Sequence, residues 1–295
     1  MPELPEVETI RAGLAKIIVG KTIKGEEHFK AKSFPNDPEL VSQFFIGATV
    51  TDVRRRAKVL LIELSTGYTI VTHLKMTGQV VIDARGEHSS LHWGGGHPSD
   101  SLIGKLPDNT TRVIVTFSDN SILYFNDLRI FGWMKLIPTA EVPNIPFMQK
   151  VGPEPLEDSF TADEFADRFT RRKKSVIKAA LLDQSVVAGV GNIYADESLW
   201  GAKIHPHTRV EKVTREQLKE LYKQVRDVMT LSIAKGGSTD KNYVDAEGKR
   251  GSYLEFANVF RREGQACPRC GATIEKLRVA GRGTHICPVE QVEVL

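Results

Sequence analysis

The spacing of the apolar residues changes from a strand-like to a helix-like pattern near Gly152-Pro153-Glu154-Pro155, about halfway along this chain of 295 residues. Between about residues 48 and 137 the apolar residues form short β-branched runs separated by turn sequences, which predicts strands. After residue 160 they recur every three or four residues, which predicts amphipathic helices. Proline and glycine at the break favour a linker. We therefore expect an α+β protein with more than one domain.

The strand-rich part contains several runs of this kind in succession, which predicts a sandwich or a barrel. The runs are Val59 to Leu64, Tyr68 to Leu74, Gln79 to Ile82, Val113 to Phe117 and Ser121 to Phe125. Asp119-Asn120 lies between the last two and predicts a hairpin. The segment from Arg85 to Asn109 is rich in Gly, Ser, His and Pro, so we expect a long surface loop there.

The helical part carries two helix-start signals with the spacing of a capping box. Thr161 precedes Glu164 by three residues, and Thr214 precedes Gln217 by the same interval. Further helices are expected over residues 175–182 and 193–200, and the tail from about residue 256 has a β-like pattern.

Composition limits the classes of protein to which the chain can belong. A net charge of +3 is only a weak indication of an anionic partner. No apolar run approaches the roughly 18 to 20 residues that span a bilayer, and the acidic N-terminus does not resemble a signal peptide. The three cysteines all lie after residue 266, which argues against a secreted disulfide framework and favours a local metal site in a reducing cytosol.

The N-terminus carries a candidate reactive group. Removal of Met1 would expose the secondary amine of Pro2, and a free α-amino group has a pKa of about 7.7 to 8.0, so part of it is unprotonated at neutral pH. Such an amine can form an iminium ion with a sugar carbon. Glu3 and Glu6 lie at the start of a helix expected over residues 6–19, where one of them can act as a general acid. Proline and glutamate are also common capping residues at a helix start, so a purely structural interpretation stays open.

Two further segments suit phosphate binding. Gly189-Val190-Gly191-Asn192 opens an expected helix, where backbone N–H groups and the Asn192 amide can hold a phosphate. The basic run 171–174 lies upstream of this turn. A tight packing turn and a solvated basic face are the structural alternatives.

The cysteines have the spacing of a zinc finger with one altered position. Cys267 and Cys270 form a CxxC pair, and Cys287 follows with Glu290 at the place of a fourth cysteine. Zinc accepts a carboxylate oxygen, so Glu290 can complete a tetrahedral site, with His285 as the other candidate. A hairpin without metal is the alternative.

Taken together, these motifs resemble the formamidopyrimidine-DNA glycosylase (Fpg/MutM) family, in order and over essentially the whole chain. The matching segments are Pro2 to Thr9, Lys58, Asp127 to Gly132, Gly152 to Leu156, Gly191 to Tyr194 and Arg282. Leu4 favours this branch over the endonuclease VIII-like branch.

The resemblance implies a fold of several parts. It implies an N-terminal catalytic β-sandwich over residues 1–138 and a linker over 139–160. A helix–two-turn–helix DNA-binding domain over 161–255 and a zinc-finger-like hairpin over 256–295 follow. DNA would lie in the cleft between the domains.

The resemblance also implies an activity: excision of oxidised purines by a bifunctional glycosylase and abasic-site lyase. Pro2 would form the Schiff base with Glu3 as acid, and Glu6 would stabilise positive charge. Lys58 or Arg282 would support β,δ-elimination. The residues implied to contact DNA are Met76, Arg129, Phe131, Lys174 and Asn192. The segment from Ser238 to Tyr253 looks like the loop that covers the lesion.

The implied partner is damaged double-stranded DNA and not a membrane, and the implied cofactor is one structural Zn²⁺ held by the residues of the finger. We expect a monomer in the bacterial cytoplasm, associated with the nucleoid. The chain departs from the family pattern at Glu290, at the long 85–109 segment, and at Asn109 to Arg112, where a DNA-contacting histidine is missing. Two alternatives stay open: an endonuclease VIII-like glycosylase for oxidised pyrimidines, and a non-catalytic sensor of lesions or abasic sites.

Overall fold

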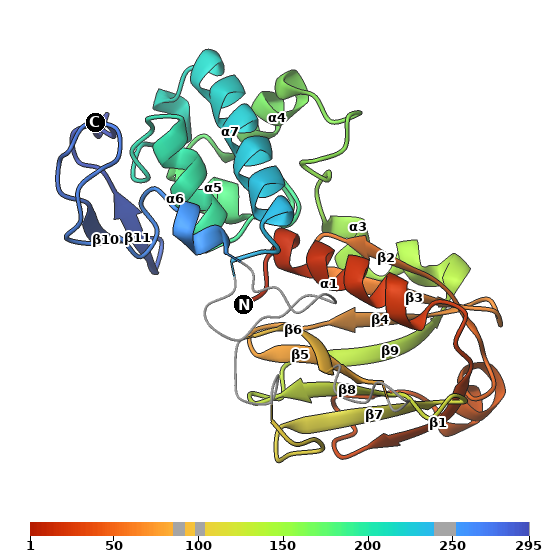
Figure 1. Cartoon of the computed structure of the whole chain (residues 1–295). Coiled ribbons are helices and arrows are strands. Elements are labelled where there is room, and N and C mark those ends of the chain that lie inside the picture. The colour runs from red at the N-terminus through yellow and green to blue at the C-terminus, as the bar shows by residue number, and fades with distance from the viewer. Residues whose placement is uncertain (85–91, 98–103, 239–251, 295) are drawn as a thin grey trace. The chain divides into compact units, whose positions relative to one another are not determined.

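The computed structural model describes residues 1–84, 92–97, 104–238 and 252–294 (Figure 1). The chain divides into two compact units. The first unit combines residues 1–149 with 235–252, and the second combines residues 150–234 with 253–295. Among the described residues, no helix is both long and apolar enough to cross a membrane.

Two antiparallel sheets form the first unit (Figure 1). One has the strand order β2-β3-β4-β9, with bounds Val50–Arg56, Val59–Leu64, Tyr68–His73 and Trp133–Pro138. The other has the order β1-β7-β8-β5-β6, with bounds Ile23–His28, Thr111–Phe117, Ile122–Asp127, Gly78–Asp83 and His92–Gly96. The predicted hairpin at Asp119-Asn120 joins β7 to β8, and Asn120 has the positive φ of 67° that such a turn uses.

Helix α1 (Leu4–Ile18) covers part of this β-sandwich and shares its core. The sequence-predicted positions Val7, Ile10, Leu14 and Ile18 are each 0–1% exposed. Each such side chain contributes about 1.5–3 kcal/mol on burial, so the apolar face fixes the helix to the sheets. The start of the chain is thereby held against a rigid sandwich.

The expectation of one long loop over residues 85–109 is wrong for residues 92–96, because β6 pairs with β5 there. The glycines that suggested a loop instead permit a close approach: a Cβ on Gly96 would lie 2.4 Å from the carbonyl oxygen of Gly78. Trp93 is 3% exposed and packs against Gly13 of α1. Residues 85–91 and 98–103 lie outside the described part of the chain.

The second unit is built from helices α4, α5, α6 and α7, with bounds Ala162–Phe169, Ile177–Leu182, Asn192–Gly201 and Arg215–Ala234. Both predicted capping signals are present. The Thr161 hydroxyl accepts a hydrogen bond from the N–H of Glu164 at 3.2 Å. Thr214 and Gln217 cap each other reciprocally at 3.2 and 2.9 Å. The short helical elements of the chain are α2 (Pro38–Leu40), η1 (Val41–Phe45), η3 (Thr139–Asn144), α3 (Pro146–Lys150), η4 (Thr170–Arg172), η5 (Val210–Lys212) and η6 (Tyr253–Phe256).

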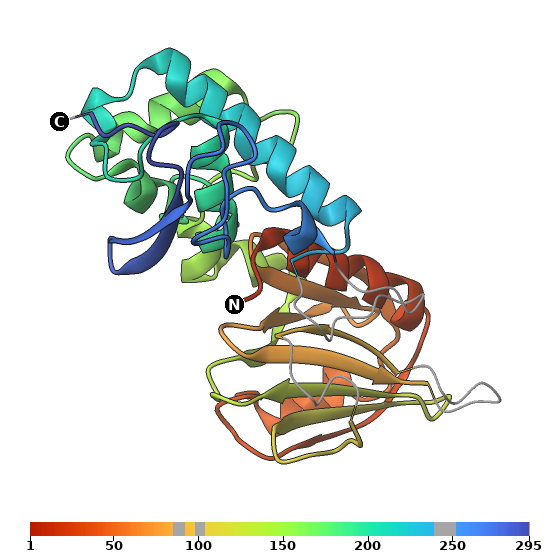
Figure 2. The same cartoon turned by 60° about the vertical axis from the view of Figure 1, so that its left-hand side comes forward.

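The C-terminal hairpin consists of β10 (Glu275–Val279) and β11 (Arg282–Ile286). Ala280 and Gly281 form its turn with φ values of 48° and 76°, the positive values typical of tight hairpins. Strand β11 contacts α6, and Figures 1 and 2 both show the hairpin beside that helix. The predicted α+β organisation, with a β-sandwich, a helical part and a terminal hairpin, is confirmed.

Candidate functional site

The start of α1 holds two buried carboxylates next to Pro2. Glu3 and Glu6 are 4% and 7% exposed, and Pro2 is buried. The Oε2 atom of Glu6 accepts a hydrogen bond from the N–H of Glu3 at 2.8 Å, as part of a capping box. Glu3 and Glu6 therefore do cap the helix, as the structural interpretation predicts. This arrangement also leaves both carboxylates beside the residue whose amine the sequence singled out.

The second carboxylate oxygen of Glu6 has partners that the sequence did not predict. Oε1 accepts hydrogen bonds from the N–H and the hydroxyl of Ser238, at 2.9 and 2.7 Å. With three donors on its two oxygens, the Glu6 carboxylate has a fixed orientation. Of the predicted lesion-covering segment, residues 239–251 lie outside the described part of the chain.

Lys58 lies in the two-residue turn between β2 and β3, after Ala57 with a φ of 52°. It is 7% exposed. His73, opposite Val59 in the sheet, is its neighbour. Burial, together with the nearby charges of Lys75 and Lys58, lowers the pKa of His73 to about 3. A neutral imidazole therefore accompanies the Lys58 ammonium. The sequence analysis did not single out His73. Its place at the end of a buried strand, three residues before Met76, could have marked it as a residue near the site.

Asp127 shapes the loop that follows β8. Its carboxylate is fully buried and accepts hydrogen bonds from the N–H groups of Phe131 at 2.8 Å and Gly132 at 2.6 Å. The Thr77 hydroxyl also donates to it, and the N–H of Arg129 lies 3.3 Å away. These bonds turn the loop so that Arg129 and Phe131 are exposed.

Met76, Arg129 and Phe131 come from neighbouring loops of the first unit. The Thr77 hydroxyl accepts a hydrogen bond from the N–H of Arg129 at 3.0 Å, which joins the loop of Met76 to that of Arg129. The guanidinium of Arg129 lies 4.7 Å from the centroid of the Phe131 ring, and Phe131 is 43% exposed. An exposed aromatic ring beside a cation can pack against a nucleobase.

In the second unit, the glycine turn before α6 is held by protein groups. The N–H of Gly189 donates to Oε1 of Gln184 at 3.0 Å, and Nε2 of Gln184 donates to the carbonyl of Val190 at 2.8 Å. These bonds are those of a tight packing turn, the structural alternative to phosphate binding for residues 189–191. Asn192 at the helix start has a different position: its Nδ2 donates to the Gly283 carbonyl at 2.9 Å, and its Oδ1 has no hydrogen-bond partner within the described residues.

A buried ion pair connects the helices of this unit to the hairpin. Nζ of Lys178 lies 2.6 Å from Oδ1 of Asp196, and both side chains are fully buried. Lys178 also donates to the Thr284 hydroxyl at 2.7 Å, and Oδ2 of Asp196 accepts from the backbone N–H of His285 at 2.9 Å. The network fixes β11, whose first residue is the exposed Arg282.

Asn192 and Arg282 are therefore held near each other, because Gly283 contacts the Asn192 amide and follows Arg282 in the chain. Lys174 is also exposed, in the turn between η4 and α5. Within the described residues no contact joins it to Asn192 or Arg282.

The three cysteines fit a zinc ion. Their sulfur atoms all lie within 4.8 Å of one another, and the Sγ atoms of Cys270 and Cys287 are 3.4 Å apart. Zn–S bonds of about 2.3 Å in a tetrahedral site separate the sulfurs by about 3.8 Å, so small movements suffice. Both candidate fourth ligands have other partners. His285 contacts Asp196 through Nδ1 at 3.2 Å, and Glu290 is ion-paired.

Glu290 is not part of the sulfur cluster in this structure. Its Oε2 lies 3.1 Å from Nη1 of Arg269 and 3.1 Å from Nζ of Lys203. These two cations hold the pKa of the Glu290 carboxyl below its usual value. The Arg269 guanidinium in turn stacks on Trp200, 3.9 Å from the ring centroid. The carboxylate is thus directed towards cations and not towards the cysteines.

Comparison with known proteins identifies the family. Residues 1–134 match the "Formamidopyrimidine-DNA glycosylase N-terminal domain", residues 151–243 its "H2TH domain", and residues 264–289 the "Zinc finger found in FPG and IleRS". The chain is 40% identical over 291 residues to the formamidopyrimidine-DNA glycosylase of Lactiplantibacillus plantarum, covering 99% of both chains. The enzyme of Herpetosiphon aurantiacus is also 40% identical, over 296 residues, with 99% of this chain and 100% of the relative covered.

Solved structures agree with the sequence comparisons. The Lactococcus lactis enzyme in complex with DNA containing an abasic site superposes with a TM-score of 0.86 at 32% identity. The match covers 99% of this chain and 100% of that one. The chain therefore belongs to the formamidopyrimidine-DNA glycosylase family, whose members act as DNA glycosylases and abasic-site lyases in base-excision repair.

Proposed function

We propose that this chain excises oxidised purines, namely 8-oxoguanine and formamidopyrimidines, from double-stranded DNA, with Pro2 as the nucleophile. The arrangement of Glu3 and Glu6 beside Pro2 carries the proposal, because catalysis by an amine needs an acid and an anion close to it. The Lactococcus lactis relative, in complex with DNA containing Fapy-dG, supports the substrate class. The protein acts as a monomer on nucleoid DNA in a bacterial cytoplasm.

The reaction proceeds in two stages. After Met1 is removed, the Pro2 nitrogen attacks C1′ of the damaged nucleotide, the base leaves, and Glu3 supplies a proton to the opening sugar. The iminium ion carries positive charge, which the oriented Glu6 carboxylate stabilises. β- and δ-elimination then remove the phosphates on both sides of the sugar, with Lys58 or Arg282 supporting their departure.

The remaining predicted residues hold the DNA. Asn192 has an acceptor without a partner within the described residues and a donor beside Gly283, and Lys174 is an exposed cation. These two groups and Arg282 contact phosphates. Met76 and Phe131 fill the space of the flipped-out nucleotide, and Arg129 hydrogen-bonds the base that has lost its partner.

The domain boundaries that accompany this proposal are those predicted from the sequence. Residues 1–138 form the catalytic β-sandwich, and 139–160 the linker. Residues 161–255 form the DNA-binding helical domain, and 256–295 the hairpin.

One structural Zn²⁺ is held by the three cysteines, and Glu290 is the fourth ligand. To reach the metal, Glu290 must leave Arg269 and Lys203. Because that exchange weakens the site, we expect zinc to dissociate more readily than from a site with four thiolates.

Borohydride trapping tests the reaction. The protein is incubated with a duplex carrying 8-oxoguanine opposite cytosine, reduced, and digested to locate the adduct. We expect a covalent adduct on the peptide that begins with Pro2 and a strong reduction of adduct in Pro2→Gly. The Glu6→Gln variant should slow trapping, whereas Glu8→Gln is the matched control, since Glu8 pairs with Arg11 and Arg55 instead.

Three outcomes would contradict the proposal. An adduct on a lysine would exclude Pro2 as the nucleophile. Faster processing of a thymine glycol duplex would favour the endonuclease VIII-like alternative. Binding of the duplex without any adduct, in a protein whose intact mass shows that Met1 is gone, would favour the non-catalytic sensor.

A further inference from the structure

A second cluster of metal-ligating side chains lies in the second unit, apart from the cysteines. It consists of His205 and His207, which flank Pro206 after α6, and Glu293 in the C-terminal tail. One ligand atom from each of the three lies within 4.8 Å of the other two. Nδ1 of His205 is 3.9 Å from Oε2 of Glu293, and the two imidazole centroids are 5.7 Å apart.

The two segments that carry this cluster are already joined by other bonds. Gln291 is 1% exposed, and its Nε2 donates to the carbonyl of Ile204 at 2.9 Å while its Oε1 accepts from the N–H of Cys287 at 3.0 Å. The N–H of Thr208 donates to the carbonyl of His205 at 3.0 Å, which closes the turn of the histidines. The cluster is therefore held together by backbone and amide bonds that need no metal ion.

The polar atoms of the cluster face one another as acceptors. Nδ1 of His205 accepts a long hydrogen bond of 3.2 Å from the N–H of His207, so it is the unprotonated nitrogen of a neutral ring. The carboxylate of Glu293, 3.9 Å away, has only acceptor oxygens. Two acceptors facing each other repel, and a cation between them would convert that repulsion into attraction. His205 is 8% exposed, so little water screens the electrostatic interaction between its Nδ1, the Glu293 carboxylate and a cation between them.

We propose that His205, His207 and Glu293 form a second metal site, for Zn²⁺ or another borderline divalent transition ion, with water completing the coordination. Two imidazoles and one carboxylate are a donor set that such ions accept. Bonds of about 2.0–2.2 Å place tetrahedral ligand atoms about 3.3–3.6 Å apart, so the 3.9 Å separation needs a shift of only a few tenths of an ångström. Coordination through Nδ1 of His205 replaces the 3.2 Å hydrogen bond that this atom accepts from the N–H of His207.

The bound ion would fasten the tail that follows Cys287 to the loop that follows α6. This is the tail in which Glu290 occupies the place of a cysteine, and a ligand three residues further along would hold the same segment. The site would therefore support the hairpin domain where the cysteine cluster has one thiolate fewer.

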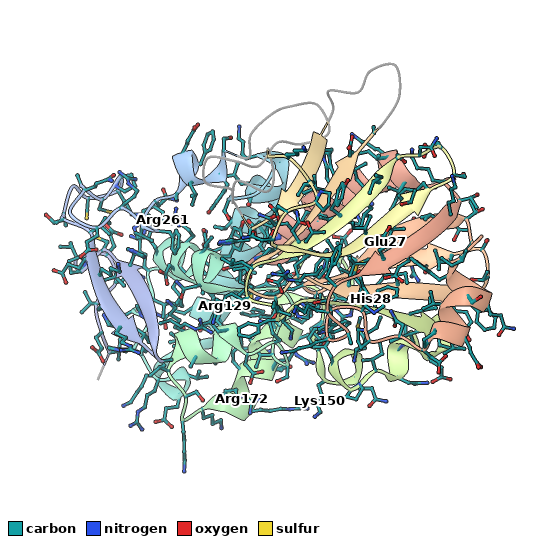
Figure 3. All side chains as sticks on the ribbon, turned by 90° about the horizontal axis from the view of Figure 1, so that it is seen from below. Glu27, His28, Arg129, Lys150, Arg172 and Arg261 are labelled. Atoms are coloured by element: carbon teal, nitrogen blue, oxygen red, sulfur yellow. The ribbon has the colours of Figure 1, made fainter. Side chains whose placement is uncertain are left out.

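Titration of the untagged, zinc-loaded protein with further Zn²⁺, followed by calorimetry, tests the proposal. We expect the wild-type protein to bind a second equivalent with micromolar or tighter affinity. The variants His207→Ala and Glu293→Gln should lose this event. His28→Ala is the matched control, because His28 is exposed on β1 in the first unit, where its ring contacts Glu26 and Phe34 (Figure 3).

Cobalt substitution separates the two sites. Thiolate-to-cobalt absorption reports the cysteine cluster, and we expect it to be unchanged in His207→Ala and Glu293→Gln. The proposal is overturned if these variants bind as many ions as the wild-type protein. It is also overturned if the second equivalent binds only at millimolar concentration, or if His28→Ala removes it too. Unchanged cobalt absorption in the variants excludes misfolding of the hairpin as the cause of a loss.

Discussion

The ammonium group of Lys178 lies 2.6 Å from the carboxylate of Asp196, and neither side chain is exposed to solvent. The pair joins α5 to α6, and through Thr284 and His285 it joins both helices to strand β11. Removing one member of a buried pair leaves an uncompensated charge, which is more costly than the loss of the attraction itself. The position of Arg282, the first residue of β11, therefore depends on this buried ion pair.

We expect Lys178→Met to destabilise the protein by about 3–5 kcal/mol, measured from urea unfolding curves. The matched control is Lys223→Met, which removes a pair of the same 2.6 Å length, Lys223–Asp227, on the exposed face of α7. Solvent screens that pair, so its loss should leave the midpoint unchanged. Equal effects of the two variants would show that burial of the first pair does not matter.

Ser238→Ala tests the orientation of Glu6. The substitution removes the 2.7 Å hydroxyl bond and leaves the backbone N–H bond at 2.9 Å. Hydrogen bonds to charged groups contribute about 1.5–3 kcal/mol, so we expect single-turnover excision to slow roughly tenfold or more, while duplex affinity is kept. A reduction in affinity alone would mean that Ser238 acts on DNA binding and not on the chemical step.

His73 should make the protein sensitive to acid. Its folded pKa is about 3, below the ordinary value of 6.5, so between these pH values the unfolded chain binds more protons than the folded one. Stability is therefore lost as pH falls below about 6.5, by about 2 kcal/mol at pH 5. We expect His73→Asn to reduce the difference between urea midpoints at pH 7 and pH 5. An unaltered difference in His73→Asn would exclude His73 as the cause.

Glu290→Cys should strengthen the zinc site. The Glu290 carboxylate is ion-paired with Arg269 and Lys203, whereas a thiolate at this position is a softer ligand that zinc binds more strongly, so it can complete a four-cysteine site. We expect zinc release to a chelator to slow markedly, measured with a colorimetric zinc indicator. Glu290→Gln, which removes the ion pairs without adding a thiolate, should not slow it. Equal release from the wild-type protein and Glu290→Cys would show that three cysteines are sufficient.

Local signals predicted much of the fold. The period of Val7, Ile10, Leu14 and Ile18 defined α1, and the run Val59 to Leu64 matched β3 at both ends. These signals depend on a few neighbouring residues, and they are strong where one face of an element is buried. Strand β6 was missed because its three consecutive glycines carry no side-chain pattern, and their role appears only in the contact with Gly78.

The parts of the site that were missed depend on distant residues. Ser238 contacts Glu6 across 232 positions of the chain, and Lys178 contacts Thr284 across 106. No property of the separate segments indicates such pairs, since each side chain is an ordinary polar residue in its own context. The role of His73 likewise depends on burial by the assembled sheet, which lowers its pKa. Glu290 was a reasonable candidate ligand by position, and only the fold brought it next to Arg269 and Lys203.

The contact between Gly13 and Trp93 has a consequence for anyone who would shorten this protein. A Cβ on Gly13 would lie 2.2 Å from Cζ2 of Trp93, so the indole occupies the space beneath the helix that begins at Leu4. Trimming the glycine-rich stretch to a minimal connection would delete Trp93 and leave a void under that helix. A cavity of this kind costs several kcal/mol and lets the helix settle inwards. Pro2 would move with it, so a deletion in this glycine-rich segment would misplace the proposed nucleophile.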